Sequence, residues 1–513
     1  MNIGSLLSWH ARFRPDHAAL VCGDERLNFA ELEIEVNRLA NALYALGLRK
    51  GDKLALVLPN CKELLHAYRA CAVLGIVSVP LSPLLRGPGL VSLLRDSDSL
   101  AVIASAAMVP ALDEVREQLT GIPDQNYIIT AASGPGGYRA YDDLTTGHSG
   151  DPPLAVDISD DDVYNIIYSS GTTGSPKGII HTHYIRAAYC TQFAGSFRFT
   201  PESVVMHAGS LVFNGAFVTL MPAWYLGCTY ILQERFDAQE FIETVARENV
   251  THVMMVPSQI VAVMNAPNFA PEKLETLQML CSVGAPWHRE HKEKLLPVLP
   301  RSLYELYGLT EGFITVLDST QFARKIDSVG TPIPFSDMRI VGADGNELPS
   351  GEVGEITGRS PMMMPGYYKR PDLTSQAIID GWLHTGDVGF ADADGFLHLV
   401  DRKKDLIISG GVNVYPKDIE EIAVQHPAVR EVAVFGVPSD KWGECPIAAV
   451  ILKSPGEISP TDLQSWINSR VAARYQRVHQ VIIADDFPRS TAGKTLKRVL
   501  REMHTEQVKE NIA

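Results

Sequence analysis

The sequence predicts an α/β protein with a large N-terminal domain of layered α/β subdomains, a small β-rich subdomain and a small α+β domain at the C-terminus. Runs of apolar, β-branched residues alternate with helical patterns along the first part of the chain, which is typical of parallel strands buried between helices. From about residue 335, D-G and S-G pairs indicate short hairpins. A charged run, DRKKD at 401–405, then separates roughly 110 residues, enough for one small domain.

The expected elements of the N-terminal domain follow a strand-then-helix order. Apolar residues at helical spacing predict a helix over 29–46, and KLALVL at 53–58 and IVSVPL at 76–81 are typical of buried strands. THVMMV at 251–256 predicts another strand, followed by a helix that begins near Pro257. The 513 residues exceed what one hydrophobic core usually supports, so we expect several subdomains.

The C-terminal part is expected to move from hairpins into a compact α+β unit. The run at 401–405 lies between the strand-like FLHLV and the apolar DLIIS, which predicts an N-terminal domain over 1–401 and a C-terminal domain over 402–513. In the latter, the patterns predict a helix that opens with proline over 415–425, a strand over 429–437 and a helix over 461–473.

Composition excludes several classes of protein. A formal net charge of -15 argues against general binding of nucleic acid, which requires a basic surface. The seven cysteines are widely spread and show no C-x-x-C or zinc spacing, which is typical of buried free thiols in a reducing compartment. The N-terminus does not resemble a signal peptide, and no apolar run is long enough to span a membrane. We therefore expect a cytoplasmic protein without stable membrane insertion, as a monomer or homodimer.

One loop concentrates groups that can bind phosphate. YSSGTTGSPKG at 168–178 holds three glycines, three serines, two threonines and a lysine, which supply backbone N–H groups, hydroxyls and a cation for a polyanion. A flexible surface turn is the alternative. The loop is not a Walker P-loop, because Pro176 precedes Lys177 where glycine is required. PRSTAGKT at 488–495 is not a Walker P-loop either, because Pro488 stands where the first glycine of the motif is required.

Five motifs together resemble a known family. YSSGTTGSPKG, YGLTE (307–311), GWLHTGD (381–387), DRKKDLIISGGVNVYPKDIE (401–420) and PRSTAGK (488–494) occur in the order seen in the adenylate-forming superfamily. This superfamily contains acyl- and aryl-CoA synthetases, adenylation domains of peptide synthetases and beetle luciferases, and the chain looks closest to the acyl-CoA synthetases. The resemblance implies a ligase that uses ATP, Mg2+ and coenzyme A, and joins a carboxylic acid first to AMP and then to the CoA thiol.

The resemblance also implies roles for individual residues of the ATP site. Lys494 would be the adenylation lysine between the acid carboxylate and the α-phosphate, and Glu311 the acidic residue near Mg2+. Thr172 and Lys177 would contact phosphates. The remaining residues implied for ATP or AMP are Ser169, Ser170, Gly171, Thr173 and Gly174 in the loop, Thr310 at the α-phosphate, Tyr307 and Ala285 at the adenine, Asp387 and Arg402 at the ribose, and Gly308.

For the second half-reaction, the resemblance implies a mobile C-terminal domain with its hinge at Lys404, near 401–405. Gly410 and Gly411 would line the pantetheine passage, and Trp442 would stack on the CoA adenine. The chain departs from the family where relatives carry Y-K-x-P, because residues 475–478 are YQRV. Two alternatives stay open: Arg477 supplies the CoA phosphate contact instead, or CoA is bound in a different way.

The acid pocket implied by the resemblance is apolar. Phe213 stands at an aromatic gate, Gly215 stands where several aryl-acid ligases have a bulky residue, and Gly308 stands where acetate-activating relatives have tryptophan. A medium or long alkyl acid, or an arylalkyl acid, is therefore expected. The walls would be Val212, Phe213, Gly215, Ala216, Val283, Leu306, Phe313 and Ile314.

Three alternatives to the CoA ligase stay open from the sequence. An adenylate-forming ligase that loads the phosphopantetheine of a carrier protein would share these motifs. So would a luciferase-type oxygenase. A catalytically silent nucleotide-binding relative is disfavoured because Lys177, Glu311 and Lys494 are all present. A peptide-synthetase module is disfavoured because the acid-binding stretch has no aspartate to capture an α-amine.

Overall fold

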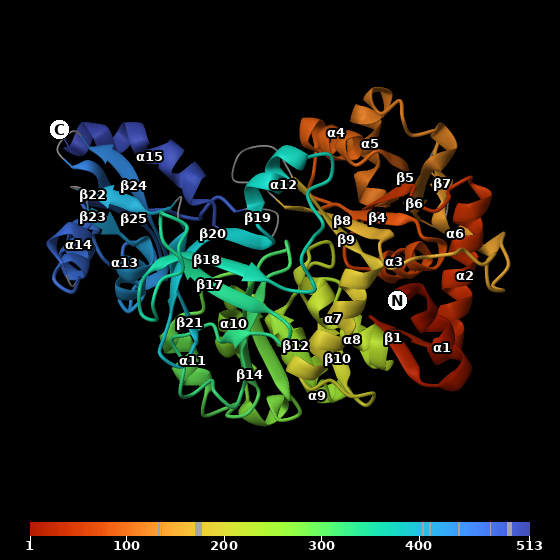
Figure 1. The fold of residues 1–513 in the computed structure, drawn as a ribbon, viewed down its shortest axis with the longest axis horizontal. Coiled ribbons are helices and arrows are strands. Elements are labelled where there is room, and N and C mark those ends of the chain that lie inside the picture. Colours follow the sequence, from red (N-terminus) through yellow and green to blue (C-terminus); the bar gives the residue numbers. More distant parts are fainter. Residues whose placement is uncertain are drawn as a thin grey trace.

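A computed structural model describes residues 1–131, 134, 136–169, 177–402, 405–409, 412–439, 442–471, 473–489 and 495–512, without the side chains of residues 169, 402, 413 and 506–512. The described residues form four sheets. The first half of the chain lies at one end of the molecule and the C-terminal part at the other, with a small sheet between them (Figure 1).

Seven strands form a sheet in the order β7-β6-β5-β3-β4-β8-β9. All neighbours pair in parallel except β8 and β9, which are antiparallel and bring Ser169 opposite Lys177. The strands are β3 (Lys53–Val57), β4 (Val77–Pro80), β5 (Ser99–Ser105), β6 (Tyr127–Thr130), β7 (Arg139–Ala140), β8 (Val163–Ser169) and β9 (Lys177–Thr182). The strands predicted at 53–58 and 76–81 are thus confirmed as β3 and β4.

Nine strands form a second sheet in the order β16-β15-β14-β13-β12-β10-β11-β1-β2. The central strands from β14 to β1 are parallel, and the outer pairs are antiparallel. The strands are β1 (Ala18–Cys22), β2 (Glu25–Asn28), β10 (Val204–His207), β11 (Thr229–Leu232), β12 (His252–Met255), β13 (Met279–Val283), β14 (Leu303–Gly308), β15 (Ile314–Leu317) and β16 (Thr331–Pro332). The strand predicted at 251–256 is confirmed as β12.

Helices fill the space between these sheets and cover their outer faces. The largest apolar cluster joins both sheets to α2 (Phe29–Ala45), α3 (Lys62–Leu74), α7 (His183–Ser196) and α8 (Gly215–Leu226). On the outer faces, α4 (Gly87–Asp96) and α5 (Val109–Val115) cover the first sheet, and α9 (Ala238–Glu248), α10 (Pro257–Met264) and α11 (Arg289–Leu295) the second. Further helices are α1 (Leu6–Phe13), α6 (Tyr141–Thr146) and α12 (Pro371–Ala377). The layered α/β fold predicted from the alternating pattern is therefore confirmed.

The third sheet is the expected β-rich subdomain. Its order is β17-β18-β20-β19, with β21 paired to β20, and all pairs are antiparallel. The strands are β17 (Asp337–Val341), β18 (Gly354–Arg359), β19 (Ile378–Ile379), β20 (Trp382–Ala391) and β21 (Leu397–Arg402).

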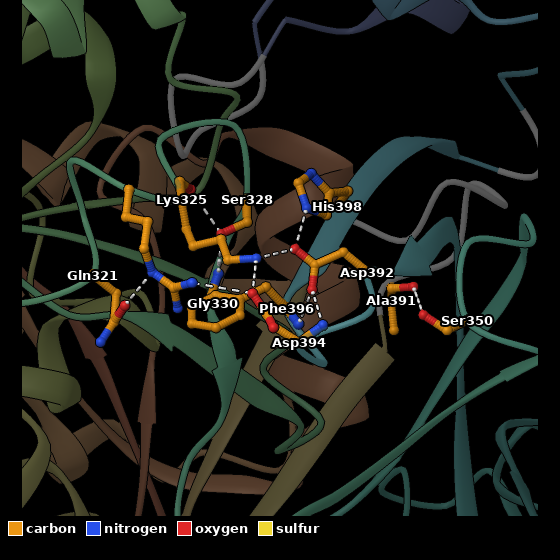
Figure 2. Close-up of polar contacts among 11 residues, drawn as sticks. Gln321, Lys325, Ser328, Gly330, Ser350, Ala391, Asp392, Asp394, Phe396 and His398 are labelled. Atoms are coloured by element: carbon orange, nitrogen blue, oxygen red, sulfur yellow. Dashed lines mark hydrogen bonds and ion pairs between the residues drawn. The ribbon is translucent and has the colours of Figure 1, made fainter.

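Ion pairs fasten the β20–β21 turn to the segment that follows β15 (Figure 2). Lys325 Nζ lies 2.7 Å from Asp392 Oδ2 and 2.7 Å from Asp394 Oδ2, and His398 Nε2 lies 3.2 Å from Asp392 Oδ2. Burial acts to raise the pKa of Asp392, but the hydrogen bonds from Lys325, the Phe396 amide and His398 outweigh it and hold this pKa well below its usual range. The contacts fix the β20–β21 hairpin against the nine-stranded sheet.

The fourth sheet forms the C-terminal unit. Its order is β23-β22-β25-β24, with β26 parallel to β25. The elements are β22 (Ile407–Ser409), β23 (Val412–Val414), α13 (Pro416–Ala423), β24 (Val429–Ser439), β25 (Gly443–Leu452), α14 (Pro460–Asn468), β26 (Gln480–Ile483) and α15 (Lys497–Ile512). Lys417 of α13 joins this unit to β21, because its Nζ donates to Leu399 O at 2.8 Å.

One predicted boundary in this unit was wrong. The helix expected over 461–473 ends at Asn468. The Asn468 amide exchanges two hydrogen bonds with the Val478 backbone, at 2.9 Å and 2.8 Å, so its side chain binds the returning chain after the helix ends.

Two further features concern the cysteines and the helices. All seven cysteines are free, and five of them are buried. No helix among the described residues combines the length and the apolar character needed to cross a membrane.

Candidate active site

Several of the described residues that were expected in the ATP site and the acid pocket lie at one edge of the nine-stranded sheet. β10, β13 and β14 run parallel, so the segments that follow them, 208–214, 284–288 and 309–313, leave the sheet on the same side. His181 of β9 joins this edge to the other large sheet, because its Nε2 donates to Thr310 O at 2.9 Å. Ligands of open α/β sheets bind outside the carboxyl ends of parallel strands, so this edge is the candidate active site.

The residues expected at the adenine and the ribose meet here. The hydroxyl of Tyr307, on β14, donates to Asp387 Oδ2 on β20 at 2.8 Å. Asp387 is 8% exposed, and its own N–H donates to Thr385 Oγ1 at 3.1 Å. In the β20–β21 hairpin, Asp387 stands opposite the backbone of Arg402, the other residue expected at the ribose. The hairpin thus brings Asp387 to the end of β14.

The lysine of the glycine-rich loop and the acidic residue of YGLTE meet at a third residue that sequence reasoning missed. The Tyr367 hydroxyl donates to Glu311 Oε1 at 2.8 Å, and the Lys177 ammonium lies 5.1 Å from the centre of the Tyr367 ring. Burial, together with the Glu311 carboxylate, raises the pKa of Tyr367 above its ordinary value, so the hydroxyl stays a donor at neutral pH. The only sequence signal was PGYYKRP, whose tyrosines adjoin a turn.

Backbone contacts hold the loop that carries Glu311. Met364 N donates to Glu311 O at 2.9 Å, and Ser360 Oγ donates to Gly312 O at 2.6 Å. Gly312 has φ +108°, and a Cβ there would lie 2.0 Å from Met362 O. Only glycine fits this close approach, which places Glu311 against the segment that carries Tyr367.

The residues expected in the acid pocket form one apolar group, with two exceptions. Val212 and Leu306 are buried in the central apolar cluster, and Phe213 and Val283 are partly buried against it. Ala216 and Ile314 belong to the same cluster. Phe313 instead belongs to the core of the β-rich subdomain, where a Cβ at Gly358 would touch its ring.

The second exception concerns the two glycines that imply room for a large acid. A Cβ at Gly215 would meet only Met254 Cε, at 3.6 Å, so the position has space for a side chain. A Cβ at Gly308 would lie 2.9 Å from Phe313 O and 2.8 Å from Ile314 Cγ1. Any side chain at Gly308 would therefore press on β15, whereas Gly215 has space for a side chain.

A buried cation lies next to the segment that was expected to bind the acid. Arg186 of α7 is fully buried, and its Nη1 and Nε donate to Asn214 Oδ1 at 2.9 Å and to Asn165 Oδ1 at 3.2 Å. Asn214 in turn donates to the Tyr189 hydroxyl at 3.1 Å. Among the described residues, no carboxylate forms an ion pair with Arg186, whose guanidinium instead lies 4.1 Å from the centre of the Phe217 ring. The network fixes Asn214, which immediately precedes Gly215 and α8.

The described residues also suit a magnesium ion held mainly by its nucleotide. Within the described part of the chain, no group of three or more histidine, cysteine, aspartate or glutamate side chains could hold a metal. Mg2+ at nucleotide sites is usually bound by one or two carboxylates together with phosphates and water. Glu311 supplies one such carboxylate, and no described residue donates a hydrogen bond to its Oε2. The donor set therefore fits Mg2+ bound with a triphosphate.

Two family models match this chain. Residues 7–368 match the AMP-binding enzyme model, and residues 418–494 match the model of the AMP-binding enzyme C-terminal domain. The chain belongs to the AMP-binding enzyme family. This confirms the family inferred from the ordered motifs, with the acyl-CoA synthetases as the nearest members.

The relatives of this AMP-binding enzyme include acyl- and aryl-CoA ligases and a ligase that acts on a carrier protein. The long-chain-fatty-acid–CoA ligase FadD13 of Mycobacterium tuberculosis is 34% identical over 520 residues, covering 99% of each chain. A feruloyl-CoA synthase of an Amycolatopsis species is 35% identical over 511 residues, covering 98% of each chain. A fatty acid–[acyl-carrier-protein] ligase, ScoC of Streptomyces coeruleorubidus, is 29% identical and covers 96% of this chain and 95% of that protein.

A solved structure of the family closely matches the fold. ATP-bound MatB from Rhodopseudomonas palustris superposes with a TM-score of 0.89 at 29% identity, covering 99% of this AMP-binding enzyme and 100% of MatB. The apo structure of MatB superposes less well, with a TM-score of 0.77 and 99% coverage of each chain.

Two of the residues expected to bind coenzyme A, Trp442 and Arg477, are described and lie in the C-terminal unit. Trp442 is exposed at 39%, and the next residue, Gly443, pairs with Ser409 at the end of β22. Gly410 and Gly411 follow Ser409 directly in the sequence. Arg477 is exposed and precedes β26. The structure thus places Trp442 beside the strand end that leads to Gly410.

Several expected residues lie outside the described part of the AMP-binding enzyme. For Ser169 and Arg402, only the backbone is described. Ala285, in contrast, is described and lies exposed after β13. The expected residues outside the description are Ser170, Gly171, Thr172, Thr173, Gly174, Lys404, Gly410, Gly411 and Lys494.

Proposed function

We propose that the chain is an ATP- and Mg2+-dependent acid:CoA ligase, which forms an acyl-AMP with release of pyrophosphate and then an acyl-CoA. The observation that carries this proposal is the convergence of Lys177, Thr310, Glu311, Tyr307 and Asp387 at the carboxyl ends of the parallel strands. These residues come from three sheets and supply a cation, a carboxylate and a nucleoside-binding pair at one place. Membership of the family and its CoA-ligase relatives support the same reaction.

In the first half-reaction, a carboxylate oxygen of the acid attacks the α-phosphorus of ATP, and pyrophosphate leaves. Carboxylate and phosphate are both anionic, so fixed cations must stand between them. Lys177 would hold the departing phosphates, Glu311 would bind the Mg2+ that accompanies them, and Tyr307 with Asp387 would hold the nucleoside. Lys494, with Thr172 of the glycine-rich loop, would complete the site at the α-phosphate.

In the second half-reaction, the CoA thiol attacks the acyl carbon and AMP leaves with the bonding electrons. We assign CoA to the face of the C-terminal unit that carries Trp442, with Gly410 and Gly411 lining the pantetheine passage and Arg477 contacting phosphate. A rotation about Lys404 would exchange the two halves of the site. The ATP-bound structure of MatB superposes on this chain with a TM-score of 0.89, and the apo structure with a TM-score of 0.77. This difference between the two MatB structures supports more than one domain arrangement in the family.

The proposed acid has a medium or long alkyl chain, or an arylalkyl body. Val212, Phe213, Val283 and Leu306 present an apolar surface, and Gly215 leaves space in front of Met254. The runner-up function is transfer of the acyl group to a carrier protein, as the name of ScoC describes for that relative. We also propose a cytoplasmic location, since all seven cysteines are free, as is usual in reducing compartments.

A panel of carboxylic acids tests the proposal. The purified chain is supplied with ATP, Mg2+ and each acid, with and without CoA, while pyrophosphate is measured and products are identified by mass spectrometry. The proposal expects acyl-CoA and AMP only when CoA is present. If acyl-AMP accumulates in the presence of CoA but reacts with a phosphopantetheinylated carrier protein, the carrier-protein function would be favoured over the CoA ligase.

A further inference from the structure

Tyr367 stands between two groups of opposite charge. Its hydroxyl donates to Glu311 Oε1 at 2.8 Å, while the ammonium of Lys177 lies 5.1 Å from the centre of its ring. Among the described residues, Lys177 and Glu311 form no ion pair with each other. One aromatic side chain thus contacts both the phosphate-loop lysine and the YGLTE glutamate.

The backbone of Tyr367 is fixed on both sides. It pairs with Ile179 of β9, two residues from Lys177, and Tyr368 N donates to Gly178 O at 2.7 Å. Its own N–H donates to Thr374 Oγ1 of α12 at 2.9 Å. The Tyr367 ring therefore has a defined place relative to β9, and the Met364 contact to Glu311 O ties the same segment to the YGLTE loop.

Lys177 and Glu311 contact the same tyrosine, and opposite charges in a partly buried site attract each other, so the two could pair if the tyrosine did not separate them. If they paired, neither charge would be available to ATP until the pair was broken. The Tyr367 hydroxyl binds one oxygen of Glu311, and the face of the Tyr367 ring contacts the ammonium of Lys177. Each charge therefore has a neutral partner that the ligand can displace.

We propose that Tyr367 is a positioning residue that keeps Lys177 and Glu311 apart, so that the lysine is available to the phosphates and the carboxylate to Mg2+. This inference rests on the proposed function, because it takes ATP and Mg2+ as the ligands of these two residues. It adds a third residue, which carries no charge, to the triphosphate site.

Calorimetric binding of ATP to the full chain, without any acid, separates the two contacts. The affinity for ATP measured in EDTA reports on Lys177. The increase in affinity when Mg2+ is added reports on Glu311. Tyr367→Phe keeps the ring and removes the hydroxyl, so binding in EDTA should stay within about twofold and binding with Mg2+ should weaken about tenfold. Tyr367→Leu removes the spacer, so binding in EDTA should also weaken about tenfold because Lys177 then reaches Glu311.

A double variant and a matched control sharpen the test. Adding Glu311→Gln to Tyr367→Leu should restore the affinity for ATP in EDTA, since the lysine loses its competing partner. Tyr368→Phe is the control, because the neighbouring hydroxyl donates to Asp98 Oδ2 at 2.7 Å, away from both charges. It should bind ATP as the wild type does in both conditions.

The outcomes distinguish this inference from the proposed function. Wild-type binding by all Tyr367 variants, or no restoration by Glu311→Gln, would overturn the role of Tyr367. If a thermal scan shows that Tyr367→Leu does not fold, Tyr367→Phe alone tests the role of Tyr367. An equal loss of ATP affinity in EDTA and in Mg2+ would then show that the tyrosine is only structural and would overturn the inference. A wild-type chain that binds no ATP in either condition would remove the proposed function itself.

Discussion

Gly215 offers a direct test of the acid pocket. It is the first residue of α8, after the segment that carries Val212 and Phe213. A Cβ there would contact only Met254 Cε, at 3.6 Å, an ordinary van der Waals distance. Gly215→Leu should therefore fold normally and place its side chain in the space proposed for the acid.

The size of the effect follows from the atoms displaced. A leucine adds three carbons beyond Cβ, enough to displace about three methylene groups of a long acid, at about 0.8 kcal/mol each. The loss of about 2.4 kcal/mol corresponds to a roughly fiftyfold fall in kcat/KM for the longest acids. Acids too short to reach Gly215 should keep their kcat/KM.

The assay is pyrophosphate release across a series of straight-chain acids, compared between the wild type and Gly215→Leu. Gly195→Leu is the matched control, because this glycine of α7 has no atom within 4 Å of an added Cβ and lies on the surface. A chain-length profile that stays the same in Gly215→Leu would show that the acid does not pass this glycine, and would refute the pocket described here.

Three further predictions concern other parts of the molecule. Lys494→Ala should reduce adenylation roughly a thousandfold and leave thioester formation from supplied acyl-AMP within about tenfold of wild type, and equal loss in both half-reactions would contradict domain rotation. Gly308→Trp should lower Tm and activity toward every acid alike, because its Cβ would press on the Phe313 carbonyl, whereas a selective gain for short acids would return Gly308 to the pocket. Asp392→Asn should lower Tm by roughly 2–4 °C near pH 7, since Lys325 and His398 lose their charged partner. Because the folded-state pKa of Asp392 is depressed, the difference in stability should be full above about pH 5 and shrink as the pH falls below about 4, and a difference independent of pH would contradict the ionic role.

The layered architecture could be predicted because local pattern and burial agree. β3 lies within KLALVL and β12 within THVMMV, since strands covered on both faces are almost continuously apolar. Helix α2 follows a capping box in which Asn28 and Glu31 exchange hydrogen bonds. The end of α14 was missed because the bonds that stop it come from Val478, ten residues further along the chain.

The candidate site was predictable where ordered motifs carry it, and not where side chains from distant segments meet. Tyr307 and Asp387 were expected at one nucleoside from the family pattern, and their contact spans 80 positions. Tyr367 carries no charge and lies in no metal or phosphate motif, so only its place beside Lys177 and Glu311 reveals it. The sequence pattern did not show that Phe313 packs in the core of the β-rich subdomain, because an apolar residue after β14 can enter either core and its neighbours in the fold decide which.

The central claim is that the acid carboxylate attacks the α-phosphorus of ATP before CoA enters. An acid labelled with 18O in both carboxylate oxygens, turned over with ATP, Mg2+ and CoA, tests this directly by mass spectrometry of the products. Attack of the carboxylate on the α-phosphorus should leave one 18O atom in the phosphate of AMP and one in the acyl-CoA carbonyl. AMP without label, or label in inorganic phosphate with ADP as the nucleotide product, would contradict an acyl-AMP intermediate.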